Sequence, residues 1–405
     1  MMWRSYLKMK SNYMVLTTCF SIAFMAYGIR YAFGMLMPEM MKELGLTNTQ
    51  AGLIYTSFLT LYTITSVLVG FLVDVKGVKR TLLAFLPLLG VGTSLMSIMS
   101  SQWMGISFFG LAGIGASVCW TPLVVWVQKA YPSRRGASLG VLQLGPNTGF
   151  GVLGLLMPLI MLYNGWRGCW LILGLLSLIW LIPLSLVTPE PSPAMTSRRG
   201  FKDHVKGLTM VLRDKAFWLG GLSYMLASFA IMIPMTFTKA YANLELHMDP
   251  TIATALFSII GFVGIIGALA IPFLSDKAGR RWSITLCNLI MALGLVGSAL
   301  MARSYMDVAM WSAIIGTSYG AIWPLYAALV KDLYGWSVVG SITGLWTLLC
   351  GIGLLLSPPL GGYVADTFGS YKPTYIMGCL IALISIALIA TIRPKPLDTY
   401  DATKG

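Results

Sequence analysis

The chain has 405 residues, of which 57% are hydrophobic and only 10% are charged. Soluble domains carry roughly 25% charged residues, so this composition excludes a soluble globular protein and indicates one that crosses a membrane many times. The formal net charge of +14 could suggest a nucleic-acid partner, but the placement of the basic residues described below indicates membrane topology, and no nucleic-acid partner is required.

Apolar runs of about 20 residues are long enough to cross the hydrocarbon core of a bilayer. The widest gap between such runs, 188–216, is rich in charge and proline and follows the sixth run. We therefore expect an N-terminal six-helix bundle over 1–187, a cytoplasmic linker over 188–216, and a C-terminal six-helix bundle with a short cytoplasmic tail over 217–405. The twelve predicted spans lie near 13–37, 51–73, 81–100, 103–128, 136–163, 167–187, 217–242, 251–274, 283–302, 308–330, 338–365 and 373–392.

The 28 lysines and arginines are unevenly distributed between the two sides of this arrangement. Most of them fall in the segments that share a side with both termini. The connecting segments of the other side hold only Lys42, Arg167, Arg303 and Lys372. Because cytoplasmic segments carry the excess of lysine and arginine, this bias predicts a multi-pass protein of the plasma (inner) membrane with both termini in the cytoplasm.

The first predicted span holds a charge, Arg30, at a depth where charge is costly. If Pro38 marks the outer end of the span, the Cα atom of Arg30 lies roughly 12 Å below that end. A guanidinium there costs between about 2.5 and more than 10 kcal/mol, depending on the scale. No carboxylate lies in the middle of any predicted span, so Arg30 has no obvious ionised partner. Tyr27 and Tyr31 share its helical face, which suits a polar cavity wall.

We interpret Arg30 as the group that meets an anionic substrate. Two alternatives remain for it, a structural hydrogen-bonding role between bundles and snorkelling to the interface.

The two halves of the sequence echo each other. The loop after the second span, Gly70–Arg80, contains Asp74, and the loop after the eighth, Pro272–Arg281, contains Asp276 at an offset of 202 residues. Trp120 in the fourth span and Trp323 in the tenth are 203 residues apart. Matching offsets indicate a duplicated six-span unit, and in transporters such repeats flank a substrate site near the bilayer midplane.

The pattern Gly-x-x-x-Asp-x-x-Gly-x-Lys-Arg over 70–80, its degenerate copy after the eighth span and the arrangement of six plus six spans resemble the major facilitator superfamily. The resemblance covers the whole chain. It implies an all-α membrane protein of twelve transmembrane helices in two pseudo-symmetric six-helix bundles, which rock about a central cavity to give alternating access.

The resemblance also implies a latch between the bundles on the cytoplasmic side. Asp74 would lie at a helix N-terminus near Ser337, and Asp276 would lie towards Ser133. The alternative is that these residues are only topology charges in tight turns. The predicted latch residues are Asp74, Arg80, Asp276 and Arg280.

Three stretches resemble the branches of this superfamily that move small anions. Tyr27–Pro38 resembles the organic-phosphate and anion–cation symporter branches, in which the arginine matching Arg30 binds the anionic group of the substrate. Ser357–Tyr371 and Tyr131–Gly140 resemble monocarboxylate and oxalate/formate transporters. The chain departs from these branches because it lacks an arginine in the eighth span, a lysine in the eleventh and a second arginine in the seventh.

Further residues are candidates for the cavity wall. Gln143 and Asn147 lie one turn apart, although the stretch 140–149 also suits close helix packing by small residues. Lys239 lies near the outer end of the seventh span, where a lysine can snorkel. The aromatic candidates could equally be core or lipid-facing residues. The complete set of substrate-binding candidates is Arg30, Tyr27, Tyr31, Trp120, Gln143, Asn147, Tyr319, Trp323 and Lys239.

The sequence contains no catalytic constellation, phosphate-binding loop or metal cluster, so we expect a transporter, not an enzyme, that uses no cofactor and acts as a monomer. Its predicted substrate is a small organic anion, with a carboxylate favoured, and its coupling partner would be a proton or a counter-anion. The missing intramembrane carboxylate favours facilitated diffusion or anion exchange, with Glu39 as the remaining protonatable group.

Two competing functions remain open. One is an exporter of drugs or of neutral or cationic metabolites, in which Arg30 is purely structural. The other is a membrane receptor that transports nothing.

Overall fold

The structure is a computed structural model that describes residues 2–131, 135–190, 212–334 and 339–392. The side chains of 2–10, 74, 135–137 and 339–341 also lie outside the described part. The linker predicted over 188–216 falls mostly on 191–211, so its bounds stay a prediction.

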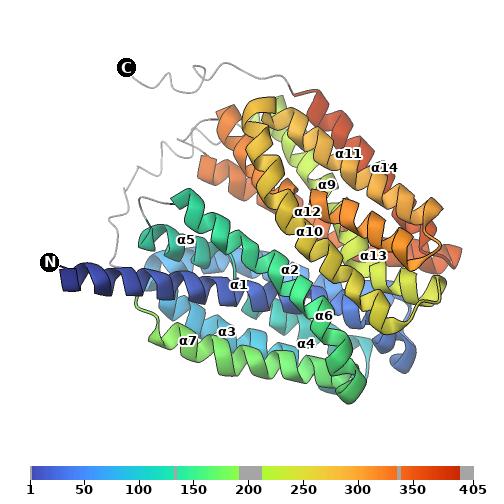
Figure 1. Ribbon diagram of the computed structural model, residues 1–405, viewed down its shortest axis with the longest axis horizontal. Helices are drawn as coiled ribbons and strands as arrows, with labels where there is room; N and C mark the ends of the chain where they lie inside the picture. The colour runs from blue at the N-terminus through green and yellow to red at the C-terminus, as the bar shows by residue number, and fades with distance from the viewer. Residues whose placement is uncertain (1, 132–134, 191–211, 335–338, 393–405) are drawn as a thin grey trace.

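The described chain is almost entirely helical (Figure 1). Helices before the linker are α1 (Met2–Leu44), α2 (Asn48–Lys76), α3 (Val78–Leu95), α4 (Gln102–Ala116), α5 (Thr121–Ala130), α6 (Arg135–Leu176) and α7 (Ile182–Val187). Helices after it are α9 (Lys215–Ala240), α10 (Pro250–Ala278), α11 (Arg280–Met301), α12 (Tyr305–Tyr334), α13 (Val339–Phe368) and α14 (Lys372–Ala390). A 3₁₀ turn over Met96–Ile98 and π turns over Ser177–Leu181 and Tyr241–Glu245 extend α3, α6 and α9.

Eleven helical stretches of the described residues are long and apolar enough to cross a membrane, and one of them is long enough to cross it twice. The stretch Ser138–Val187 has 50 residues, which corresponds to about 75 Å of helix and more than twice the hydrocarbon thickness. It turns back at Gly165, whose backbone is non-helical with φ 60° and ψ −177°. Glycine adopts positive φ without the steric penalty of a Cβ atom. The twelve predicted crossings are therefore present, six in each half.

The first span differs from its prediction, because Pro38 does not end it. Helix α1 continues to Leu44 with Pro38 in its interior, which membrane helices tolerate because neighbouring groups satisfy the freed backbone. Arg30 thus lies fourteen residues from the end of the helix, about 21 Å, which is deeper than predicted. Glu39, which follows the predicted end of the first span near 37, lies within the helix.

The fourth span is interrupted, although the sequence predicts one helix over 103–128. Helix α4 ends at Ala116 and α5 begins at Thr121, with Trp120 at φ −136° and ψ −73° between them. Pro122 lies in the first turn of α5, where it supplies no N–H and its ring would clash with the carbonyl four residues earlier in a continuous helix.

The sequence repeat recurs in the backbone. Positive φ angles of 64° at Gly45 and 54° at His247 turn the first and seventh spans into the next. Gly77 and Gly279, with φ of 86° and 89°, occupy the two signature loops, and Gly165 and Gly369, with φ of 60° and 64°, precede the last span of each half. These pairs are 202, 202 and 204 residues apart, so corresponding turns have corresponding geometry.

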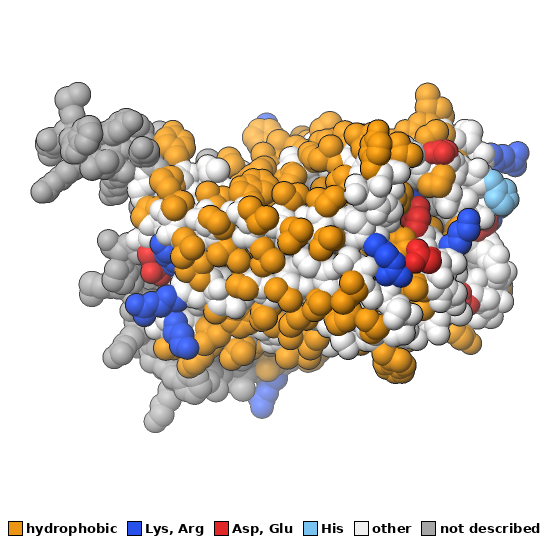
Figure 2. Space-filling view, turned by 90° about the horizontal axis from the view of Figure 1, so that it is seen from below, with side chains coloured by type: hydrophobic (Ala, Val, Ile, Leu, Met, Phe, Trp, Pro, Cys, Tyr) orange, Lys and Arg blue, Asp and Glu red, His pale blue; other side chains and the backbone are white. Residues whose placement is uncertain are grey.

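The helices of each half pack into one bundle, and the two bundles meet lengthwise (Figure 1). We call the end with Gly77 and Gly279 the signature-loop face and the end with Gly45 and Gly369 the far face. Figure 2 shows hydrophobic side chains over the middle of one side of the molecule, with charged side chains gathered towards the two ends. This distribution suits a belt of lipid around the middle.

Three pairs of helices join the bundles: α1 with α9, α2 with α13, and α6 with α10. Glycines allow the backbones to approach closely at each seam. A Cβ atom on Gly34 would lie 2.4 Å from the carbonyl oxygen of Met235, and one on Gly52 would lie 2.5 Å from that of Pro358. Of the predicted substrate-binding residues, Tyr27, Arg30, Tyr31, Gln143, Asn147 and Lys239 lie on helices of these seams, whereas Tyr319 and Trp323 lie on α12 and Trp120 lies between α4 and α5.

Candidate functional site

Arg30 lies on α1 where that helix faces α9, and only 6% of it is exposed. Its Nη2 atom is 4.0 Å from the sulfur of Met232, and its Nε atom is buried without a hydrogen-bond partner. No described carboxylate forms an ion pair with it. The guanidinium carbon lies 5.8, 5.3 and 6.0 Å from the ring centroids of Tyr27, Tyr31 and Tyr62, within the range of cation–π attraction.

A cavity of about 10 Å³ lies against Arg30, which is room for about one water molecule. The hydroxyl of Tyr55, on α2, is also buried without a partner. Tyr27 and Arg30 were predicted from the sequence as substrate-binding residues. The other wall residues, Ala26, Phe58, Tyr62, Ala116 and Cys119, were not in the predicted set, and Tyr62 looked more like a packing residue. Ala116 and Cys119 lie at the break between α4 and α5, which the apolar pattern does not reveal. The described residues contain no group of three or more His, Cys, Asp or Glu side chains that could hold a metal.

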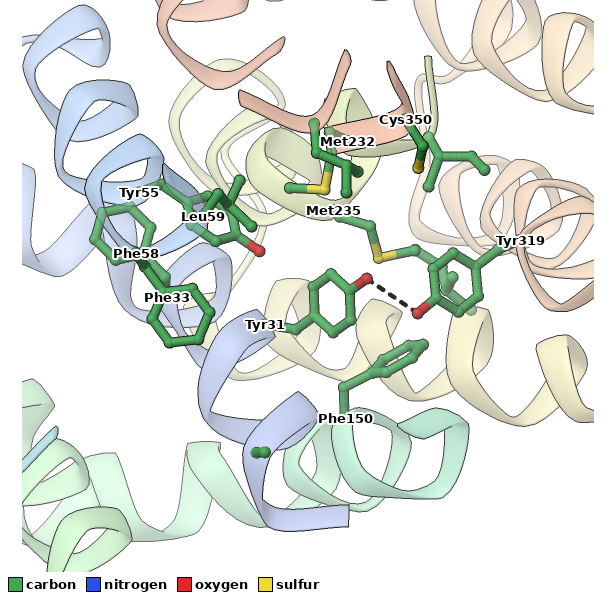
Figure 3. Packing of buried hydrophobic residues seen from close by; sticks show 14 of the residues in the cluster. Tyr31, Phe33, Tyr55, Phe58, Leu59, Phe150, Met232, Met235, Tyr319 and Cys350 are labelled. Carbon is green, nitrogen blue, oxygen red and sulfur yellow. Dashed lines mark hydrogen bonds between the residues drawn. The ribbon is translucent and has the colours of Figure 1, made fainter. Parts of the chain in front are cut away.

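The predicted aromatic residues form one continuous chain across both bundles. The hydroxyl of Tyr319, on α12, donates a hydrogen bond to that of Tyr31, on α1, at 3.0 Å, and the ring of Phe150 lies edge-on beside both (Figure 3). The ring centroids of Trp120 and Tyr27 are 6.3 Å apart, and those of Trp323 and Tyr319 are 6.2 Å apart. The two tryptophans that echo each other in sequence therefore lie at opposite ends of this chain.

The two predicted amides of α6 differ in their surroundings. Asn147 is 1% exposed and neither polar atom of its side chain has a partner. It faces α10, where a Cβ atom on Gly264 would lie 3.6 Å from its Oδ1 atom. Gln143 is half-buried and does not line the Arg30 cavity. The neighbouring glycines of α6 pack closely against α1, because a Cβ atom on Gly149 would lie 2.2 Å from the carbonyl oxygen of Phe24.

Lys239, on α9, does not snorkel to the interface. Its side chain is fully buried, and its Nζ atom donates to both carboxylate oxygens of Glu39 at 2.6 and 2.7 Å and to the carbonyl oxygen of Met35 at 2.5 Å. The three N–H groups of the ammonium are thereby satisfied. Both charged residues stood out in the sequence, but their pairing did not, because the predicted first span ends before Glu39.

A carboxylate of one bundle caps a helix of the other at the far face. Asp366, at the end of α13, accepts hydrogen bonds from the backbone and side chain of Asn48 at 3.0 and 2.9 Å and from those of Thr49 at 2.8 and 2.5 Å. A carboxylate at a helix N-terminus also interacts favourably with the helix dipole. The Tyr371 hydroxyl adds a bond to the Asn48 side chain at 2.6 Å. Asp366 thus makes, at the far face, the contact between a carboxylate and a helix N-terminus that was predicted for Asp74 at the signature-loop face.

The predicted latch is only partly within the described structure. The Asp74 side chain, Ser133 and Ser337 lie outside the described residues, so their contacts stay predictions. Arg80 is exposed and forms no ion pair with a described carboxylate.

In the second signature loop, the charged residues pair within their own bundle. Arg280 forms an ion pair with Asp276 and another, at 3.4 Å, with Asp332 at the end of α12. In the first signature loop, Lys79 has a role that was not predicted from the sequence. Lys79 donates to the carbonyl oxygens of Leu186 and Thr188 at 2.5 and 3.0 Å, at the end of α7.

Comparisons with known proteins place this geometry in a family. The chain is 26% identical to monocarboxylate transporter 4 of Mus musculus over 391 residues, covering 93% of this chain and 82% of that protein. It is 22% identical to the hexuronate transporter of Bacillus subtilis, covering 91% of this chain and 93% of that protein. It is 24% identical to the probable sulfoacetate transporter of Cupriavidus necator, covering 98% and 96%.

Solved structures share the fold at low sequence identity. The nucleoside transporter NupG aligns with a TM-score of 0.77 and 13% identity over 94% of this chain and 100% of that one. A bacterial homolog of the human lysosomal transporter Spinster, in an inward-facing and unoccupied conformation, aligns with a TM-score of 0.78 and 14% identity over 94% and 95%. The family model of the Major Facilitator Superfamily matches residues 19–358 and 221–404. The chain belongs to the major facilitator superfamily and is a multi-pass transport protein, not an enzyme.

Proposed function

We propose that this protein moves a small organic anion, with a carboxylate the favoured class, across the plasma membrane through a site centred on Arg30. The observation that carries the proposal is the guanidinium itself, which is buried with an unpartnered Nε atom and faces no described carboxylate. An unpaired buried donor carries its full desolvation cost, and an anionic ligand removes that cost with charge-assisted hydrogen bonds.

The surroundings of Arg30 suit an anion with a small organic body. The guanidinium presents a planar fork that binds a carboxylate through two parallel hydrogen bonds. The Tyr31–Tyr319 hydroxyl pair lies next to it and comes from both bundles. A ligand that contacts Arg30 and Tyr319 together would touch both bundles, so its binding would depend on their relative position. This dependence is what alternating access requires, because a ligand shifts a conformational equilibrium only through differential contacts.

The size of the cavity bears on how a substrate would reach Arg30. The cavity of about 10 Å³ beside Arg30 has room for a water molecule but is too small for a carboxylate. The hydrogen bonds described above hold the two bundles together from the far face, at Asp366 and Lys239, down to Tyr31 near the middle of the molecule. We infer a transport cycle in which the bundles part at the signature-loop face to bind or release substrate, with the far face, extracellular by the placement of lysine and arginine, closed.

The names of the relatives support the substrate class. Monocarboxylate, hexuronate and sulfoacetate are all anions that carry a carboxylate. Their bodies differ from one another in size and polarity, so they support a carboxylate in general and no particular compound.

The direct test is a thermal-shift screen of the purified protein against lactate, pyruvate, oxalate, glucuronate, sulfoacetate and glycerol 3-phosphate. A ligand that binds only the folded state raises the melting temperature, and the shift grows with the logarithm of its concentration relative to Kd. We expect at least one carboxylate to stabilise the protein and Arg30→Ala to abolish the shift. Arg303→Met is the control, since Arg303 is exposed at the far face and its loss changes the net charge equally. An unchanged shift in Arg30→Ala would disprove the role of Arg30.

Energy coupling is a second part of the proposal. Because no described carboxylate contacts Arg30, we favour facilitated diffusion or anion exchange, with Glu39 as the protonatable group nearest the seam. Proteoliposomes loaded with a pH indicator test this point. Proton uptake that follows substrate stoichiometrically and persists in Glu39→Gln would contradict it.

One observation favours a different substrate class. Arg30 contacts Met232 and three tyrosine rings, which gives it partners within the protein and a structural function without any anion. The aromatic chain would then bind neutral or cationic compounds for export. Arg30→Ala separates the two functions, because export of such compounds would survive the substitution while anion transport would not.

A further inference from the structure

The seam between α1 and α9 carries a second buried cation besides Arg30. Met232, Met235 and Lys239 follow one another along α9 at spacings of three and four residues, so they share the helical face that meets α1. Met232 contacts Arg30, and the Met235 carbonyl lies against Gly34. Lys239 is seven residues from Met232, about 10 Å along the helix towards the far face.

The ammonium of Lys239 is held by a carboxylate in the geometry that an anionic ligand would use. Glu39 offers both oxygens to Nζ at 2.6 and 2.7 Å, and the Met35 carbonyl is the third acceptor. The Lys239 side chain is fully buried, whereas 23% of the Glu39 side chain is exposed. The carboxylate is therefore the more exposed partner, and the cation lies behind it.

The partners of this pair belong to different bundles, α1 and α9. When the far face opens, these helices must separate, and the short contacts between Lys239 and Glu39 lengthen. Lys239 then remains in a seam that leads to Arg30 with its acceptors withdrawn. A buried or half-buried ammonium without an acceptor is costly, so an incoming carboxylate would be bound there.

We propose that Lys239 is a second anion site, on the path from the far face to Arg30, and that Glu39 is a tethered competitor that occupies it when the far face is closed. The ligand of this site is a carboxylate, the same class as proposed for Arg30, so the inference rests on the proposed function. Glu39 returns as the anion moves on and closes the path behind it.

Other charged and titratable groups near the pair come from neighbouring elements. Cys169 of α6 and Asp249, which caps α10, contribute to the electrostatic environment of Lys239. Asp249 accepts hydrogen bonds from the backbone N–H groups of Thr251 and Ile252 at 2.8 and 3.3 Å, so it is committed to its own helix. Glu39 is the carboxylate hydrogen-bonded to Lys239.

The experiment compares Glu39→Gln with Lys239→Gln, because both variants remove the same ion pair but only the first keeps the cation. Uptake of lactate, glucuronate and sulfoacetate from the far-face side is measured in oriented proteoliposomes. We expect Glu39→Gln to lower KM by about threefold to tenfold and Lys239→Gln to raise it by about tenfold, with the double variant resembling Lys239→Gln. Equal shifts of KM in the same direction in the two single variants would mean that the pair is only a lock, and would overturn the proposal.

A labelling measurement covers the case in which Glu39→Gln fails to fold with an unpaired lysine. A cysteine introduced as Glu39→Cys reacts with an anionic sulfonatoethyl and a cationic trimethylammonium-ethyl thiosulfonate reagent of similar size. We expect the anionic reagent to react at least about fivefold faster, and this preference to disappear in Glu39→Cys/Lys239→Gln. An absent preference in the first variant would overturn the proposal.

Arg30→Ala distinguishes the failure of this inference from the failure of the proposed function. If anion uptake survives Arg30→Ala, the proposed function itself is wrong. If uptake is lost in Arg30→Ala while Glu39→Gln and Lys239→Gln behave alike, the Arg30 site stands and only the second site is wrong.

Discussion

The two halves of the molecule share one frame but differ in chemistry where they meet. Arg30 and Met232 occupy equivalent positions, 202 residues apart, and their side chains contact each other across the seam. One half therefore supplies the charge and the other supplies a soft, polarisable thioether at the same place. A second arginine at position 232 would bring two like charges together at membrane depth, which is strongly unfavourable.

The fourth and tenth spans show the same departure from symmetry. Pro122 and Pro324 are 202 residues apart, yet the helix is interrupted before Pro122 and continues through Pro324 in α12. The interruption lies in the half that carries Arg30, and Ala116 and Cys119 beside it line the Arg30 cavity. The comparison teaches that the turns preserve the duplicated frame, while the residues around the Arg30 cavity differ between the two halves.

The largest effect is expected from moving the charge between the halves. In Arg30→Met the affinity for a carboxylate should fall by at least about 30-fold, because removing one partner of a buried charge pair costs roughly 2–5 kcal/mol. The swap Arg30→Met/Met232→Arg restores a guanidinium on the opposite wall. We expect it to recover part of the affinity, measured by thermal shift with the carboxylate that stabilises the wild type. A swap as inactive as the single variant would show that the two positions are equivalent in the fold but not in binding.

The two outer seams offer the next largest effect. Asp366 accepts four hydrogen bonds from Asn48 and Thr49 across α2 and α13, whereas the seam of α6 and α10 presents the unpartnered amide of Asn147. Asp366→Asn weakens bonds to a charged acceptor, each worth about 1.5–3 kcal/mol. Thr56 lies in the same seam, so Thr56→Cys provides a cysteine that reports on opening. We expect this cysteine to react with an impermeant maleimide about tenfold faster in Thr56→Cys/Asp366→Asn than in Thr56→Cys alone.

Two variants control this measurement. Asp249→Asn changes the net charge equally, but Asp249 caps its own helix, and the hydrogen bond from the Thr251 backbone lowers the pKa of its carboxyl below the ordinary value. Asn147→Ala removes no hydrogen bond within the described structure. Faster labelling in either control would mean that the far face is not held by Asp366.

The hydroxyl pair between the halves should have a smaller effect. The bond from Tyr319 to Tyr31 measures 3.0 Å, and a neutral hydrogen bond contributes about 1 kcal/mol, or roughly fivefold in an equilibrium. Tyr31→Phe and Tyr319→Phe should each lower anion affinity by about that factor. The double variant should lose no more than either single one if the two hydroxyls act as a unit, as a double-mutant cycle would show. Additive losses would mean that each hydroxyl contacts the ligand separately.

Much of the fold follows from local sequence signals, and much of the site does not. The number of spans follows from the length of the apolar runs, and the duplication follows from the repeated motifs. Arg30 stands out because it is a charge within an apolar run. Which charged residues form ion pairs depends instead on which helices meet. Lys239 and Glu39 are 200 residues apart, and a single misplaced helix end at Pro38 hid the fact that they lie at the same depth.

The walls of the cavity show the same limit. Phe58 and Cys119 look like ordinary core residues, and Cys119 lies in the interruption of the fourth span, which the apolar pattern does not predict. Asp366 appears in the sequence as an outer-loop charge, because nothing local indicates that the N-terminus of α2 lies beside it. A sequence pattern locates residues along the chain, whereas these contacts depend on how two bundles are placed against each other.

The smallest expected effect compares the two signature loops as helix caps. Lys79 donates to carbonyl oxygens at the end of α7, and Arg281, 202 residues later, donates to that of Ile392 after α14 at 2.8 Å. A cation at a helix C-terminus contributes about 0.3–1 kcal/mol. Lys79→Met and Arg281→Met should therefore each lower the melting temperature slightly, and Lys79→Met more so, because Lys79 reaches two carbonyls and Arg281 one. Exposed Lys372→Met is the control. Melting curves in which only one loop variant differs from this control would mean that the shared loop motif holds the last helix in one bundle alone, so that even the frame of the repeat has begun to diverge.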